Sequence, residues 1–88
     1  MTNPTPESDA DLLRKIKAGD TQATRLLVDQ YLDRIVNYGT RMLGDRSEAE
    51  DVAQEAFLRL WRNLHTWRAE APVIHWLQRV TYNLCIDR

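Results

Sequence analysis

Apolar side chains recur at intervals of three and four positions along most of this sequence, which is the period of an α-helix. The pattern predicts a short first helix, followed by a long helix that Asp20 caps and Gly44 closes. Two more helices are predicted over residues 47–63 and 73–88, separated by a loop at residues 65–71 where the apolar period fails. The sequence therefore predicts an all-α, compact bundle of about four helices with a loop before the last helix.

The helix predicted over residues 47–63 has two different faces. We expect Ser47 to cap this helix, with Glu50 reaching back to the backbone N–H of the cap. A core-facing stripe consists of Ala53, Ala56, Phe57, Leu60, Trp61 and Leu64. The opposite stripe consists of Asp51, Gln54, Glu55, Leu58 and Arg62. This second stripe is either a solvated face or a surface for a partner, and the leucine within it favours a partner.

Composition limits the classes of protein to which the chain can belong. Its 88 residues, 43% of them hydrophobic, suffice for one modest core. There is no apolar run of the ~20 residues that a transmembrane helix needs, and no basic and apolar start typical of a signal peptide. The single cysteine, Cys85, excludes an internal disulfide. We therefore expect a cytoplasmic protein without membrane insertion.

We expect residues 9–88 to form one domain, preceded by a disordered tail at residues 1–8. The last helix reaches Arg88 without a cap, which leads us to expect a domain of a longer protein.

Charge is unevenly distributed along the chain. Residues 1–57 carry seven basic and eleven acidic side chains, whereas residues 58–88 carry five arginines and two acids. This asymmetry indicates two surfaces for two kinds of partner.

The sequence holds no pattern typical of catalysis. His65 and His75 lack neighbours at ligand spacing, and no glycine-rich phosphate loop is present. We therefore predict that the protein is not an enzyme and that it binds no metal and no cofactor.

Two motifs carry a resemblance to a known family. The first is the run DVAQEAFLRLWR over residues 51–62, and the second is WLxRVxxNxCIDR over residues 76–88. The chain thereby resembles region 2 of an extracytoplasmic-function (group 4) RNA polymerase sigma factor, over roughly residues 9–88. The resemblance implies a bacterial transcription-initiation factor of the kind used in stress responses. It also implies a second, region 4 domain for the −35 element, which we do not find in this chain.

The resemblance implies a binding site for core RNA polymerase. In this family the helix of the first motif docks on the clamp helices of the β′ subunit. Carried over by position, the docking residues are Asp51, Gln54, Glu55, Leu58 and Trp61. Leu58 would be the apolar anchor, whereas the position of Trp61 on the inner stripe makes it a core residue first.

The resemblance also implies a binding site for promoter DNA. In this family the loop before the last helix, and that helix itself, bind the single-stranded −10 element of the non-template strand. Carried over by position, the DNA-binding residues are Trp67, Arg68, Arg79, Asn83 and Arg88. Trp67 either stacks on a base or folds back on the core, and Asn83 either contacts a base edge or bonds loop carbonyls. The arginines would hold the phosphate backbone.

The function that we predict is a sigma factor domain that docks on polymerase and recognises and melts the −10 element. An anti-sigma factor is an expected further partner, because members of the family commonly have one. The alternative is a sigma-like decoy, which binds an anti-sigma factor without binding DNA. Retention of the predicted DNA-binding residues favours the sigma factor over the decoy.

Overall fold

The computed structural model describes residues 9–66 and 72–87, and these residues form four α-helices and one 3₁₀ turn. The elements are α1 (Asp9–Lys17), α2 (Thr21–Leu43), α3 (Arg46–Arg62), η1 (Leu64–Thr66) and α4 (Val73–Ile86). There is no β-strand in the described part of the chain, which confirms the prediction of an all-α bundle. The predicted tail at residues 1–8 lies outside the described residues.

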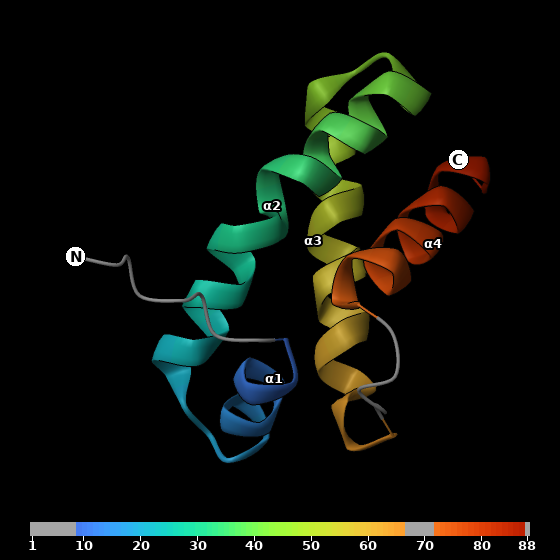
Figure 1. Cartoon of the computed structure of the whole chain (residues 1–88). Helices are drawn as coiled ribbons and strands as arrows, with labels where there is room; N and C mark the ends of the chain where they lie inside the picture. Colours follow the sequence, from blue (N-terminus) through green and yellow to red (C-terminus); the bar gives the residue numbers. More distant parts are fainter. Residues whose placement is uncertain (1–8, 67–71, 88) are drawn as a thin grey trace.

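The two long helices, α2 and α3, pack along each other, and α1 and α4 complete the bundle (Figure 1). The short α1 lies against the beginning of α2, while α4 contacts both α2 and α3. Gly39 allows the close approach of α3 to α2, because a Cβ atom at this position would lie 3.2 Å from the Cβ of Ala49. The interior glycine of the long helix is therefore explained by helix packing.

The predicted limits of α2 are confirmed. The Asp20 carboxylate accepts hydrogen bonds from the backbone N–H groups of Gln22 and Ala23, at 3.0 and 3.1 Å. At the other end, Gly44 adopts a left-handed conformation with φ of 71°, and its N–H donates to the Thr40 carbonyl. Both groups satisfy backbone atoms that the helix ends would otherwise leave unpaired.

The predicted cap of α3 was wrong. The helix begins at Arg46, and its cap is Asp45, whose carboxylate accepts a hydrogen bond from the Glu48 N–H at 3.0 Å. Asp45 can reach this group because its own backbone is extended, directly after the left-handed Gly44. Ser47 therefore lies inside the first turn, and Glu50 pairs with Arg46 at 3.6 Å.

The core is contributed by all four helices and by Leu64 of η1. For α3 the predicted inner stripe is buried, apart from Trp61, which is half-buried and packs against the core. For α4 the apolar period of the sequence predicts an inner stripe of Trp76, Leu77, Val80 and Leu84. Leu77 is completely buried and the other three are partly buried against the core, where Val73, Ile74, Thr81 and Cys85 are buried as well. The buried face is wider than the predicted stripe because α4 packs against both α2 and α3.

Within the described residues, no helix combines the length and the apolar character that crossing a membrane would require.

Candidate functional site

The outer stripe of α3 lines an open hollow of about 520 Å³ between α2 and α3. Asp51, Gln54 and Leu58 form the α3 wall, and the half-buried Trp61 lies at the same wall. Four of the five predicted polymerase-binding residues are thus brought together at one surface feature. Leu58 is 41% exposed at this wall.

The opposite wall belongs to α2 and was missed in the sequence. Val28, Leu32 and Val36 recur at intervals of four along α2 and line the hollow together with Asp33. Leu32 is 37% exposed, so two partly exposed leucines, one from each long helix, line the same hollow. The spacing of these three apolar residues, beside the buried stripe of Leu27, Tyr31 and Ile35, was the signal that could have revealed this wall.

The rim of the hollow is acidic. Asp33, Glu50 and Asp51 line it, and Arg46 is the basic residue among its lining residues. Arg46 and Glu50 form an exposed ion pair at 3.6 Å, which leaves the charges of Asp33 and Asp51 in excess. An apolar floor with an acidic edge suits a partner that combines apolar and basic side chains.

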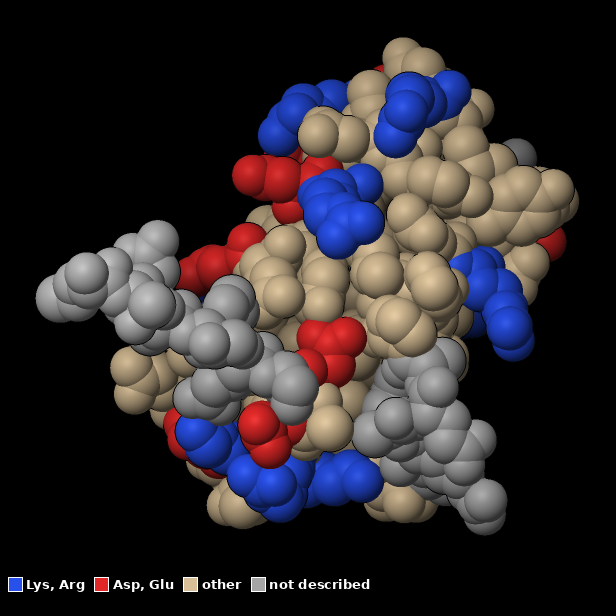
Figure 2. All heavy atoms as spheres, viewed as in Figure 1, with Lys and Arg blue, Asp and Glu red and all other residues tan. Residues whose placement is uncertain are grey.

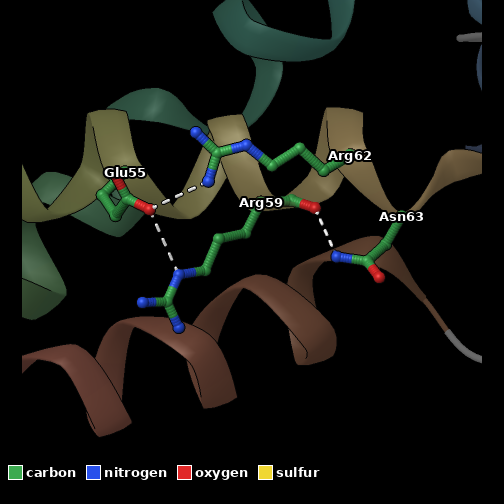
Figure 3. A network of polar contacts seen from close by, with 4 residues as sticks. All are labelled: Glu55, Arg59, Arg62 and Asn63. Atoms are coloured by element: carbon green, nitrogen blue, oxygen red, sulfur yellow. Dashed lines mark hydrogen bonds and ion pairs between the residues drawn. The ribbon is translucent and has the colours of Figure 1, made fainter.

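Glu55, the fifth predicted residue, does not line the hollow. One of its carboxylate oxygens accepts a hydrogen bond from Arg59 Nε at 3.2 Å and lies 3.5 Å from Arg62 Nη1 (Figure 3). The Asn63 amide donates to the Arg59 carbonyl at 2.7 Å and helps to end the helix. The charge of Glu55 is therefore already balanced by two arginines of its own helix. Such exposed pairs contribute little to stability, about 0–1 kcal/mol.

A second candidate surface lies on α4, none of whose residues lines the hollow. Arg79 and Asn83 are both exposed and are four positions apart, so they lie on one face of the helix. Tyr82 and Ile86 are exposed on the same side, with exposed fractions of 46% and 56%. The other predicted DNA-binding residues, Trp67, Arg68 and Arg88, lie outside the described residues.

Charged side chains are not spread evenly over the face of the molecule that Figure 2 shows. On the face drawn in Figure 2, lysine and arginine gather near α1 at the bottom and near the α2–α3 connection at the top. The surface between them is mostly uncharged, with some acidic side chains and one basic group at the right edge. An uncharged surface of this kind is available for contacts with apolar groups and with bases.

Comparison with known proteins identifies the family. Residues 27–88 match Sigma-70 region 2. The chain is 42% identical over 76 residues to the ECF RNA polymerase sigma factor SigW of Bacillus subtilis, which covers 86% of this chain and 41% of the relative. It is 38% identical over 79 residues to the RNA polymerase sigma-H factor of Pseudomonas aeruginosa, covering 90% and 41%.

A third relative is the ECF RNA polymerase sigma-E factor of Haemophilus influenzae, with 32% identity over 86% of this chain and 40% of the relative. The chain thus spans about two fifths of the length of these relatives. These matches confirm the resemblance to extracytoplasmic-function sigma factors that the two motifs indicated. The chain belongs to the Sigma-70 region 2 family.

Proposed function

We propose that this domain docks on core RNA polymerase, at the β′ subunit, and binds the single-stranded −10 element of a promoter during transcription initiation. The observation that carries the proposal is the hollow between α2 and α3, where two exposed leucines, Leu32 of α2 and Leu58 of the helix of the first family motif, lie beside acidic side chains of both helices. The membership of this chain in the Sigma-70 region 2 family supports the proposal as well.

The hollow suits a partner helix. A groove between two helices accepts an amphipathic helix whose apolar side chains enter it at helical spacing. Leu58 and Leu32 would be the apolar anchors, because each already exposes more than a third of its surface. Asp33 and Asp51 would attract basic side chains and set the register of the partner, and Gln54 would supply a hydrogen bond.

Glu55 takes a different part in this proposal. Arg59 and Arg62 both contact one oxygen of its carboxylate, Oε2, so a partner that binds Glu55 would use the other oxygen or compete with these arginines. Glu55 would thus orient the basic end of α3, and its predicted contact with polymerase stays a prediction. Trp61 would support the docking wall from the core side, against the ring of Phe57, whose centroid lies 6.0 Å away.

The α4 face suits single-stranded DNA. An asparagine amide presents a donor and an acceptor side by side, which matches the edge of an unpaired base. The Asn83 side chain is exposed and makes no hydrogen bond with the rest of the described chain, while Arg79, one turn earlier, can contact a phosphate. Exposed Tyr82 offers a ring on which a base can stack. Trp67, Arg68 and Arg88 remain predictions, as do promoter melting, an anti-sigma partner and a cytoplasmic location.

The docking half is tested by a pull-down with purified bacterial core RNA polymerase. We expect Leu58→Asp and Leu32→Asp each to weaken binding at least tenfold, because a carboxylate cannot be buried against an apolar anchor site without a large desolvation penalty. Gln54→Ala should weaken binding less. The matched control is Leu26→Asp, since Leu26 is a similarly exposed leucine of α2 that does not line the hollow. Equal binding by all four variants, at unchanged helicity, would show that polymerase docks elsewhere.

The DNA half is tested with a fluorescent single-stranded decamer selected from a random pool on the wild-type chain, and with a scrambled decamer. We expect Asn83→Ala to reduce the preference for the selected decamer about tenfold, the effect of losing one base contact of ~1–3 kcal/mol. Arg79→Ala should weaken binding to both decamers and lower the salt dependence. If the chain binds no decamer but captures an anti-sigma factor, the decoy alternative is correct.

A further inference from the structure

The N-terminus of α4 is capped by a residue 64 positions away in the sequence. Pro72 precedes the helix and has no side-chain acceptor, so α4 lacks a cap of its own. The Val73 N–H donates instead to Asp9 Oδ2, at 2.9 Å, from the first residue of α1. In Figure 1 the beginnings of α1 and α4 lie next to each other, as this contact requires.

Asp9 is itself held by α2. Its other carboxylate oxygen, Oδ1, accepts a hydrogen bond from the Tyr31 hydroxyl at 2.5 Å. Burial, together with the hydrogen bond and the charge of Asp9, raises the pKa of Tyr31 to about 12. Tyr31 therefore keeps its proton at neutral pH and remains a donor to Asp9. One carboxylate thus joins three helices, and both of its oxygens are used.

The contact is important because water cannot replace Asp9 as the hydrogen-bond partner of the Val73 N–H. Val73 is completely buried, so a lost partner for its N–H leaves an unsatisfied donor inside the protein unless the first turn of α4 moves. The start of α4 is the fixed end from which Arg79 and Asn83 follow, about 9 and 15 Å along the helix at 1.5 Å per residue. A shift of the helix at Val73 would move both side chains, because they are part of the same short helix.

We propose that Asp9 is a positioning residue for promoter recognition: it fixes the start of α4 and thereby the orientation of Arg79 and Asn83 toward the DNA strand. This inference rests on the proposed function of α4. It assigns α1 a part in DNA recognition, although its side chains need not touch DNA. It also predicts that docking on polymerase, through α2 and α3, is insensitive to Asp9.

The test compares Asp9→Ala with Asp9→Asn in the binding of the selected and scrambled decamers. Asp9→Ala removes both acceptors, and we expect the preference for the selected decamer to fall about five- to tenfold. Asp9→Asn keeps a carbonyl oxygen for the Val73 N–H and should stay within about twofold of the wild type. The matched control is Asp11→Asn, since Asp11 is an acidic residue of the same helix that forms an ion pair with Arg14 of that helix, at 3.1 Å.

Three outcomes would overturn the inference. The first is an unchanged preference in Asp9→Ala while Asn83→Ala loses it, which leaves the proposed function intact. The second is loss of polymerase pull-down in Asp9→Ala in parallel with the loss of preference, because Asp9 would then support the whole fold. The third is an unchanged preference in Asn83→Ala, which removes the proposed function itself. If Asp9→Ala lacks wild-type helicity, Asp9→Ser replaces it, since a serine hydroxyl is too short to reach both partners.

Discussion

Tyr31 shows how one side chain links the packing of three helices. It is a core residue of α2, only 6% exposed, yet its hydroxyl donates to Asp9 of α1, and Asp9 in turn accepts from the backbone of α4. A buried hydroxyl without a partner would destabilise the core by about 1–3 kcal/mol. The apolar ring and the polar tip of Tyr31 therefore have separate tasks, one in the core and one at the junction.

The pKa of Tyr31 leads to a prediction for alkaline pH. Because folding raises this pKa from 10.0 to about 12, the neutral hydroxyl contributes stability that is fully present below pH 10 and is lost as the pH rises through 12. A pKa difference of this size corresponds to at most roughly 2–3 kcal/mol. We expect the stability advantage of the wild type over Tyr31→Phe to shrink by that order between pH 9 and 12. Urea denaturation of both proteins at several pH values measures it, and a constant difference would contradict it.

At the scale of helices, the sequence predicted the features that depend on residues close together in one helix, namely the positions of the helices and the ends of α2. The apolar period located α2, α3 and α4, and the local chemistry of Asp20 and Gly44 located the ends of α2. The cap of α3 was misassigned because two acceptable caps, Asp45 and Ser47, lie two positions apart. The choice between them is made by backbone dihedral angles that the residue types do not reveal.

The site was predicted in the same uneven way. The α3 wall of the hollow could be predicted from the residue pattern of a single helix. The α2 wall with Leu32 could not, because it becomes part of the hollow only when the two helices pack together. The Asp9 contact to Val73 joins residues 64 positions apart, so no periodicity within a helix could indicate it. Contacts between segments far apart in the sequence could thus not be predicted from the sequence pattern.

The cap of α3 gives a prediction with a matched control. Asp45→Ala removes the acceptor of the Glu48 N–H and should lower the free energy of unfolding by about 1 kcal/mol, within the usual 0.5–2 range for a lost cap. Ser47→Ala, two residues later on the same exposed turn, should change it by less than about 0.5 kcal/mol. Thermal denaturation of both variants distinguishes the assignments. A larger loss in Ser47→Ala than in Asp45→Ala would contradict the cap described for α3.

For the whole molecule, the uneven charge of the sequence corresponds to two candidate surfaces. The acidic N-terminal part of the chain contributes Asp33, Glu50 and Asp51 to the rim of the hollow, and the arginine-bearing C-terminal part contributes Arg79 to α4. Basic partner side chains would meet the first surface and phosphates the second. No residue of α4 lines the hollow, so the two surfaces consist of different residues.

Two separate surfaces predict independent effects of substitutions. Leu58→Asp should weaken polymerase binding and leave decamer binding unchanged, while Asn83→Ala should do the reverse. In the double variant each loss should equal that of the corresponding single variant, to within the 0.3–0.5 kcal/mol, about twofold, found for sites without shared partners. Fluorescence anisotropy and quantitative pull-down on the four proteins measure both affinities. If Leu58→Asp lowered decamer affinity more than about threefold at unchanged helicity, the two surfaces would be coupled through the core, and docking would itself tune promoter recognition.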